Sequence, residues 1–245
     1  MKLPVTIALT AASSWALAQP YPGPPRAPPP PPPATIQVTG AAQISETPDR
    51  VYIDIGVTTQ AQDSEAAASQ NAARLSAVLT AVRRAAGPGA QLTTTEYSIN
   101  PNYTYPRRGG PPAVVSYTVS NVVQVRLDDL RRIGGVIDAA TRAGSNNVQD
   151  IRFALRDQQV PRNQALREAV LNARQDADAL ADALGLKVVR VLSVNEEGAA
   201  GVPYYPRGRI FAQAEAAAAP TPVEAGTLDV SATVTLTVEV APASR

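Results

Sequence analysis

The alternation of apolar and polar residues divides this chain into strand-like and helix-like segments. Alternation with period two predicts half-buried strands, and apolar residues that recur every three or four positions predict amphipathic helices. By these patterns we expect strands over residues 36–45, 51–58, 92–105, 114–127, 148–156, 188–194 and 228–240, and helices over residues 63–86, 129–143 and 161–184. The predicted order of elements is ββαββαβαββ.

The most regular strand runs from Leu228 to Val240, where one face is entirely apolar and the other carries Asp, Ser, Thr and Glu. A strand with one apolar and one polar face is typical of an antiparallel sheet covered on one side. Thr47-Pro48-Asp49 predicts a turn that joins the first two strands as a hairpin. The expected fold class is therefore α+β, with one or more antiparallel sheets and helices packed on one face.

Short signals mark the ends of the predicted helices. Asp63 suits an N-cap, and Gly87, Gly144 and Gly185 suit helix stops. The pair Gly134-Gly135 lies inside the second predicted helix, which suggests close packing of its backbone against a strand or a neighbouring subunit. The expected buried stripes are Ala68, Ala72, Leu75, Val78, Leu79, Val82 and Ala86 in the first helix, and Leu166, Ala169, Val170, Ala173, Ala177, Leu180 and Leu184 in the third.

The N-terminal residues predict export. Residues 1–18 combine Lys2, a short apolar run and Ala16-Leu17-Ala18, which is typical of a signal peptide cleaved between Ala18 and Gln19. Residues 19–34 form a proline-rich leader, expected to be extended, and residues 35–245 form the folded domain. We expect a periplasmic protein with no transmembrane segment after cleavage, with outer-membrane association as a further possibility.

Composition removes several classes of chemistry. The chain has no cysteine and no histidine, which excludes disulfides, thiolate nucleophiles and imidazole bases. Loss of Lys2 with the signal leaves 21 of the 22 basic residues, which match the 21 acidic ones. A neutral chain argues against nucleic-acid binding, because that requires a basic surface. We expect no cofactor.

The acidic pairs Asp128-Asp129 and Glu196-Glu197 are the best candidates in the sequence for general acid–base catalysis. Helix capping and solvation explain them better, because neither pair has a visible supporting group. Asn121 interrupts the apolar face of its strand, which we attribute to a bulge or to a buried amide with its hydrogen bonds satisfied. We expect a protein that is not an enzyme.

Tyrosine and arginine gather around the predicted loop at residues 106–112. An aromatic and basic tip of this kind suits contact with a sugar, a peptide or a neighbouring subunit. The alternative is an ordinary hairpin with cross-strand aromatic pairs. The candidate interaction residues are Tyr103, Tyr105, Arg107, Arg108 and Tyr117, with Tyr204 and Tyr205 in the later loop at residues 198–225.

Several stretches together resemble the SIMPL-domain family of bacterial periplasmic and surface proteins. They are Val38-Thr39-Gly40, Thr47-Pro48-Asp49, Thr94-Thr95, Ser98-Ile99, 101–105, 117–121, 143–146, Ile151-Arg152-Phe153, 167–185 and 226–240. The resemblance implies an α+β domain, export to the periplasm and ring-like or channel-like homo-oligomers, and some relatives are linked to oxidative-stress tolerance. It implies no catalytic residue.

Two functional hypotheses follow from these patterns. The first is a non-enzymatic exported envelope protein that self-assembles into an oligomer, with a link to envelope or oxidative-stress tolerance as a further expectation. The alternative is a periplasmic module that binds a glycan or peptide through the tyrosine and arginine hairpin. A third possibility, an enzyme that uses carboxylates alone, has no pair of acids placed together by the sequence.

Overall fold

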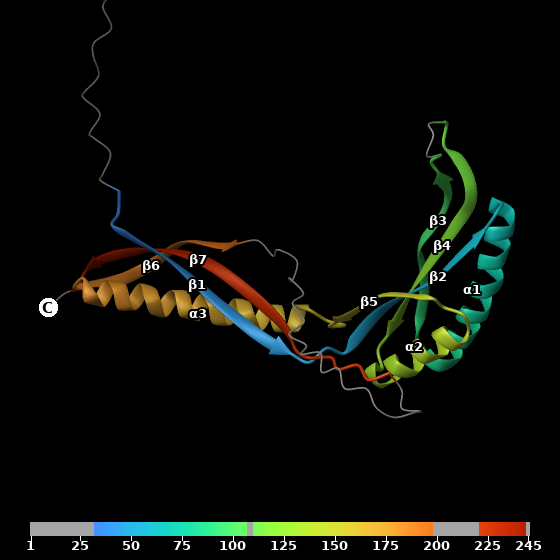
Figure 1. Cartoon of the computed structure of the whole chain (residues 1–245). Helices are drawn as coiled ribbons and strands as arrows, with labels where there is room; N and C mark the ends of the chain where they lie inside the picture. The colour runs from blue at the N-terminus through green and yellow to red at the C-terminus, as the bar shows by residue number, and fades with distance from the viewer. Residues whose placement is uncertain (1–31, 107–109, 198–220, 244–245) are drawn as a thin grey trace, which may run out of the picture. The chain divides into compact units, whose positions relative to one another are not determined.

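A computed structural model describes residues 32–106, 110–197 and 221–243 of the chain. The predicted signal peptide with its Ala18–Gln19 junction, most of the proline-rich leader, Arg107, Arg108, Tyr204 and Tyr205 lie outside these residues. The elements are β1 (Thr35–Glu46), β2 (Arg50–Ala61), α1 (Ser64–Ala86), β3 (Gln91–Thr104), β4 (Ala113–Leu127), the 3-10 turn η1 (Leu130–Arg132), α2 (Ile133–Arg142), β5 (Asn147–Ala154), α3 (Gln159–Ala183), β6 (Leu186–Glu197) and β7 (Leu228–Pro242) (Figure 1). The predicted order of strands and α-helices, and the α+β class, are confirmed.

The described strands form two antiparallel sheets. The three-stranded sheet has the order β1-β7-β6, and the four-stranded sheet has the order β3-β4-β2-β5. The predicted hairpin of the first two strands is therefore wrong, because β1 pairs with β7 along its whole length while β2 pairs with β4 and β5. The turn at Asp49 is fixed instead to the end of β5: its backbone N–H donates to Ala154, and its carboxylate accepts from the Arg156 N–H at 2.7 Å.

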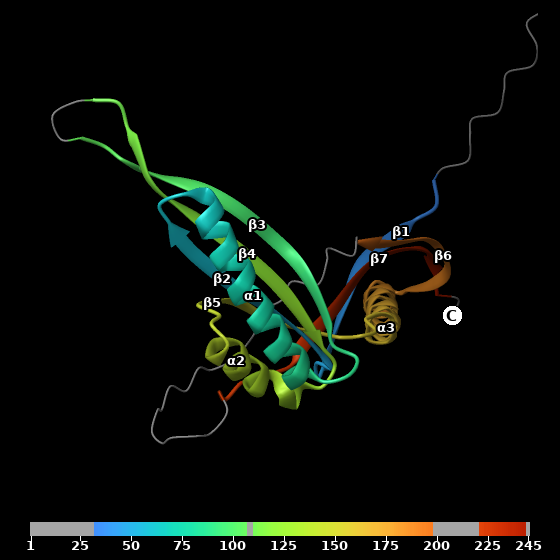
Figure 2. The same ribbon diagram turned by 90° about the vertical axis from the view of Figure 1, so that its right-hand side faces the viewer.

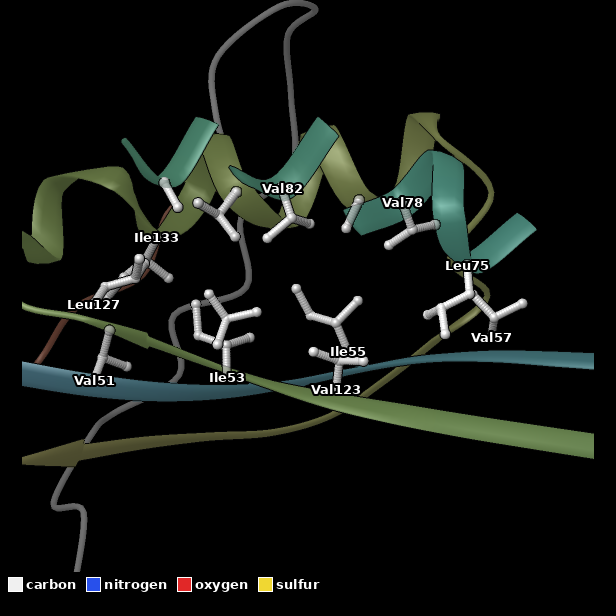
Figure 3. Packing of buried hydrophobic residues seen from close by; sticks show 14 residues of the cluster. Val51, Ile53, Ile55, Val57, Leu75, Val78, Val82, Val123, Leu127 and Ile133 are labelled. Atoms are coloured by element: carbon white, nitrogen blue, oxygen red, sulfur yellow. The ribbon is translucent and has the colours of Figure 1, made fainter. Parts of the chain in front are cut away.

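The helices α1 and α2 cover one face of the four-stranded sheet (Figure 2). Figure 3 shows the valine, isoleucine and leucine side chains of the strands pointing at those of the two helices. Burying each such side chain stabilises the fold by about 1.5–3 kcal/mol, so this layer contains the larger aliphatic core. The fully buried members include Val51, Ile53, Ile55, Val57, Val78, Val82, Val125, Ile133 and Val136.

The ends of α1 follow the predicted signals. Its predicted buried face is confirmed at Leu75, Val78, Val82 and Ala86 but differs in the first two turns. The Asp63 carboxylate accepts from the Ala66 N–H at 2.7 Å, and Gly87 ends the helix with a φ of 74°. Ala67 and Asn71 are buried where Ala68 and Ala72 were expected. Ala68 and Ala72 instead line the side of α1 that faces β3.

The helix α3 covers one face of the three-stranded sheet with a stripe of small residues. The buried positions recur every fourth residue and are Pro161, Ala165, Ala169, Ala173, Ala177 and Ala181. The prediction that Val170, Leu180 and Leu184 belong to the buried face is wrong, and Leu184 is 67% exposed. The apolar face of β7 is buried as predicted, from Val230 to Val240.

Gly40 of β1 allows α3 to approach the sheet closely. A Cβ atom at this position would overlap the backbone carbonyl oxygen of Ala169 and the backbone nitrogen of Ala173. By contrast, Gly135 in α2 is exposed and has open space around the position of a Cβ atom. Of the pair Gly134-Gly135, where the sequence suggested close packing, Gly134 is buried and Gly135 has open space beside it. The close approach of a helix to a strand lies at Gly40, which the sequence did not single out for this role.

These two glycines make a matched pair of predictions. We expect Gly40→Ala to lower the free energy of unfolding by about 1–3 kcal/mol, because backbone atoms have to move. We expect Gly135→Ala to raise it by up to about 1 kcal/mol, because alanine favours an exposed helix more than glycine does. Urea unfolding of the two variants beside the parent chain measures both changes, and a Gly40→Ala variant as stable as the parent contradicts the close approach.

Candidate functional site

The predicted interaction residues that the structure describes lie on the β3–β4 hairpin. This hairpin extends past the N-terminal end of α1 (Figure 2). Tyr103 and Tyr105 are exposed, Tyr105 to 75%, while Tyr117 is half-buried. The hairpin tip therefore presents two free aromatic rings, and Tyr117 belongs to the hairpin's packed part.

Cross-strand pairing brings some of the predicted residues together and separates others. Tyr117 lies opposite Pro101, and Tyr103 lies opposite Val114 after an irregularity in the register. No two of the described tyrosines face each other across the hairpin, so the aromatic-pair interpretation does not account for their exposure.

Sequence reasoning missed further apolar residues on the same hairpin. Ile99, Val114 and Val115 are exposed beside the tyrosines. A cluster of amides and hydroxyls is also present, in which Ser116 accepts from Gln60 at 2.7 Å and from Asn102 at 2.9 Å. The sequence feature that could have indicated the exposure of Val114 and Val115 is their position directly after a proline-rich loop, where no predicted helix covers the strand.

A second exposed apolar surface lies on β6. Val189, Val191, Leu192 and Val194 are all more than a third exposed, and Val194 is 54% exposed. This strand forms an edge of its sheet, since β7 is its only partner among the described strands. The sequence signal is the run Val188–Val194, whose apolar residues do not alternate, and the register shifts within this run confirm its irregularity.

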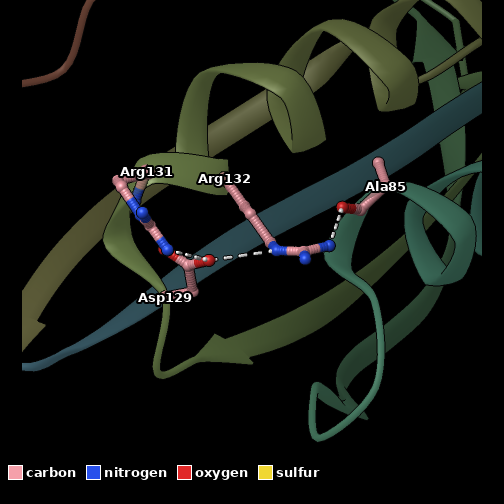
Figure 4. A network of polar contacts seen from close by, with 4 residues as sticks. All are labelled: Ala85, Asp129, Arg131 and Arg132. Carbon is pink, nitrogen blue, oxygen red and sulfur yellow. Dashed lines mark hydrogen bonds and ion pairs between the residues drawn. The ribbon is translucent and has the colours of Figure 1, made fainter.

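The acidic pairs are held by arginines and hydroxyls. Asp128 contacts Arg50 at 2.8 Å and Arg156 at 3.5 Å, and Asp129 caps η1. Arg131 and Arg132 both contact Asp129, and Arg132 also donates to the Ala85 carbonyl at the end of α1 (Figure 4). This arrangement agrees with the interpretation that Asp129 is a capping residue.

The hydrogen bonds from Arg131 and Arg132 lower the pKa of Asp129 to about 2, and the hydrogen bond from Arg50 lowers the pKa of Asp128. Both carboxylates are therefore ionised at neutral pH and have no proton to donate. In the second acidic pair, Glu196 binds Arg162, and Glu197 accepts from the Thr235 hydroxyl. The two pairs serve as ion-pair and hydrogen-bond partners in the structure.

The structure supports neither of the two predicted explanations for Asn121. It pairs in regular register with Val57 on β2 and Tyr97 on β3, and the bulge lies on β3 between Thr94 and Glu96. Its side-chain oxygen is buried and has no hydrogen-bond partner among the described residues. The prediction of a bulge or a satisfied amide at Asn121 is therefore wrong.

Two further observations limit the chemistry of the described part of the chain. Within residues 32–106, 110–197 and 221–243 there is no group of three or more potential metal ligands among the acidic side chains. No helix in these ranges is both long and apolar enough to cross a lipid bilayer.

The structure is that of an α+β protein. Helices cover one face of each antiparallel sheet, and exposed apolar residues lie on edge strands. Residues 36–238 match SIMPL, a family described as a protein of unknown function (DUF541). The chain belongs to the SIMPL family.

Curated relatives are similar over part of their length. The 26 kDa periplasmic immunogenic protein of Brucella melitensis biotype 1 is 30% identical over 166 residues, which are 66% of this chain and 66% of that protein. The uncharacterized protein YggE is 25% identical in Edwardsiella ictaluri, over 74% of this chain and 75% of that protein. In Escherichia coli K12 it is 23% identical, over 65% and 64%. The matched region thus spans about two thirds of the length of the Brucella relative.

Solved structures give no further guidance. The crystal structure of AtUAH in complex with glyoxylate matches 55% of this chain and 34% of that chain with a TM-score of 0.28 and 16% identity. An amidase of the hydantoinase/carbamoylase family from Burkholderia phymatum matches 59% and 35%, with a TM-score of 0.24 and 14% identity. Similarities of this size carry no conclusion about the chain.

The Asp129 contacts predict a specific titration. Because its folded-state pKa of about 2 lies below the ordinary value of 3.8, the stability that Asp129 contributes is fully present above about pH 4. It is lost as the pH falls through the folded-state pKa. We expect the Asp129 carboxyl carbon signal in an NMR titration to have its midpoint near pH 2, and Arg131→Gln to move the midpoint upward. A midpoint near the ordinary aspartate value in the parent chain contradicts the bonded geometry.

Proposed function

We propose that this chain is an exported, non-enzymatic protein of the bacterial periplasm that self-assembles through the edge of β6. The signal-like residues 1–18 and the periplasmic name of the Brucella relatives support export. The observation that carries self-assembly is the exposed apolar edge strand β6. The link to stress tolerance that the family resemblance implies stays a prediction.

The edge of β6 has the properties that strand pairing requires. An edge strand offers a row of unpaired N–H and C=O groups, and proteins that remain monomeric protect such edges with charge, proline or a covering element. β6 is 12 residues long, and its run from Val188 to Val194 contains one charged residue, Arg190. Pairing with another strand would satisfy these groups and bury valine side chains that are now exposed.

A second copy of this chain is the occupant that we propose. The other edge of the same sheet is β1, which is partly occupied because the Asn172 side chain donates to the Ala41 carbonyl oxygen at 2.9 Å. β6 has no comparable side-chain cover among the described residues, so it is the more available edge. A β6–β6 contact would be two-fold symmetric. A contact between β6 and another edge would give a ring where the rotation between copies closes and an open filament where it does not.

The ion pairs support a role without catalysis. A general acid or base needs a pKa near the working pH, whereas Arg50 lowers the pKa of Asp128, and Arg131 lowers that of Asp129. The absence of cysteine and histidine removes the usual nucleophiles and bases. The experiment that bears most directly on the proposal is the mass of the particle in solution.

Charged substitutions on β6 test self-assembly. We expect the chain lacking residues 1–18 to form a defined oligomer at micromolar concentration. The double variant Val191→Lys/Val194→Lys should raise the dissociation constant by at least about tenfold, because like charges would meet across the paired edges. Light scattering coupled to size-exclusion chromatography measures the mass, and circular dichroism confirms that the variant is folded.

The matched control is Leu171→Lys. Leu171 is 60% exposed on α3, at a position outside the alanine stripe that contacts the sheet. This variant should assemble as the parent chain does. A strictly monomeric parent chain refutes the proposal, and an equal loss of assembly in the control refutes the role of β6.

A second candidate function is a binding module for a glycan or peptide. The observation that favours it is the exposed group of tyrosines, Tyr103 and Tyr105, with Ile99 and Val114 on the same hairpin. Tyrosine rings bury a large area at a low cost in side-chain entropy, which makes them common in binding surfaces. Peptidoglycan, which contains both sugars and peptides, is a suitable envelope probe.

Removing the two rings tests this second function. The parent chain should co-sediment with purified peptidoglycan, and Tyr103→Ala/Tyr105→Ala should raise the dissociation constant by about tenfold, equivalent to about 1.4 kcal/mol. Tyr52→Ala, on the central strand β2, serves as the matched loss of a tyrosine outside the hairpin. Unchanged sedimentation of the double variant contradicts binding through the hairpin tip.

A further inference from the structure

A hollow lies where α1 and α2 pack side by side on the four-stranded sheet (Figure 2). Its volume is about 350 Å³, which is within the range of sites that bind small molecules. The lining consists of two arginines and four alanines, which are Arg84, Arg142, Ala81, Ala85, Ala139 and Ala143. Each of these residues is at least partly exposed, so a molecule in the hollow can contact all of them.

The two arginines of the hollow are not neutralised by the described part of the chain. Arg84 and Arg142 are exposed, and neither forms an ion pair with a described residue, whereas Arg50, Arg162 and Arg190 each bind a carboxylate. A guanidinium group stays protonated at any pH at which a protein is folded. The hollow therefore holds two positive charges that come from separate helices and have no counter-charge in its lining.

The acidic residues of the two helices do not compensate these charges. Asp138 lies one turn before Arg142 on α2, but its carboxylate accepts from the Thr221 hydroxyl at 2.7 Å. The acidic residue of α1 is Glu65 in its first turn, which is about 28 Å along the helix axis from Arg84. At that distance the charge of an exposed carboxylate is screened by salt.

The end of α1 adds further positive charge beside the hollow. Arg132 donates to the carbonyl oxygen of Ala85, which is one of the lining residues (Figure 4). The carboxylate that Arg132 binds is Asp129, and Asp129 is also bound by Arg131. Two guanidinium groups thus share one carboxylate at this end of α1, and the charge of the surface around the hollow favours an anion.

The two kinds of lining residue fit different parts of one ligand. Guanidinium groups bind oxyanions through charge-assisted hydrogen bonds. The oxygens of a phosphate point in three dimensions and can meet donors from two helices, whereas those of a carboxylate lie in one plane. The alanine methyl groups offer a small apolar contact, which suits a few carbon atoms attached to the anion.

We propose that this hollow binds the phosphate group of a small organic phosphate of the glycerol phosphate type. Arg84 and Arg142 bind the phosphate oxygens, and the alanines contact the carbon atoms. The same chemical group occurs in free organic phosphates and in the headgroups of anionic phospholipids. The hollow lies in the four-stranded layer and β6 belongs to the other sheet, so the site does not depend on self-assembly.

An NMR titration of the chain lacking residues 1–18 tests the ligand. We expect glycerol 3-phosphate to bind with a dissociation constant of about 1 mM at low salt, and to shift the backbone amide signals of residues 81–85 and 139–143. Glycerate, which has a carboxylate in place of the phosphate, should bind at least about threefold more weakly, and glycerol should not bind. Physiological salt should weaken binding severalfold, because the charges are exposed.

Vesicle sedimentation separates the two sources of the phosphate group. A headgroup site predicts that the chain sediments with phosphatidylglycerol vesicles and not with phosphatidylcholine vesicles. A site for free organic phosphates predicts the NMR shifts without sedimentation in either case. Both of these results support the site and assign its ligand.

Variants assign the binding to the hollow. Arg84→Gln/Arg142→Gln should raise the dissociation constant for glycerol 3-phosphate by at least about tenfold. The matched control Arg74→Gln/Arg167→Gln removes two exposed arginines outside the hollow, so it has the same net charge and should bind as the parent does. Ala81→Phe fills the hollow and should abolish binding, and circular dichroism checks that each variant is folded.

Three outcomes overturn the proposal. The first is the absence of amide shifts at about 20 mM glycerol 3-phosphate and low salt. The second is an equal loss of affinity in the Arg74→Gln/Arg167→Gln control, because the phosphate then responds to net charge alone. The third is binding that survives Ala81→Phe in a folded variant, because the ligand then lies elsewhere on the chain.

Discussion

The close contact between α3 and β1 at Gly40 is the constraint on which the three-stranded sheet depends. Alanines at every fourth position of α3 present almost no side chain, so the helix backbone reaches the strand. An alanine buries little apolar area, and the stability of this layer therefore comes from many close van der Waals contacts. The same contact holds α3 over β1 and β7, where most of its packing lies.

Local signals in the sequence predicted the elements well, because each depends on neighbouring residues alone. Asp63, Gly87 and Gly185 act where expected, since capping and positive φ angles are properties of single positions. The pairing of β1 with β7 could not be predicted in this way, because Thr35 and Glu239 meet across most of the chain. The face of α3 was misassigned because Leu180 and Leu184 are more hydrophobic than the alanines that are buried.

The candidate surfaces were predictable to different degrees. Tyr103 and Tyr105 were recognisable because a proline-rich and glycine-rich loop marks a solvent-exposed hairpin tip. The apolar run that contains Val191 and Val194 was visible in the sequence, but its exposure could not be predicted, since it depends on where α3 lies over the sheet. Asn121 could be recognised as a polar residue that interrupts an apolar strand face. Asn71 could not be recognised among the alanines of α1, because its amide donates to carbonyls of two strands that are distant in the sequence.

The width of a helix explains why both candidate surfaces involve edge strands. An α-helix with side chains is about 10–12 Å wide, and neighbouring strands are about 4.8 Å apart, so one helix covers roughly two strands. α3 lies chiefly over β1 and β7 and contacts β6 less, which leaves the apolar residues of β6 from Val189 to Val194 exposed. α1 lies chiefly over β2 and β4, which leaves β3 at the margin and Tyr97 exposed. In each layer, the strand that extends beyond its helix is the one free to contact another molecule.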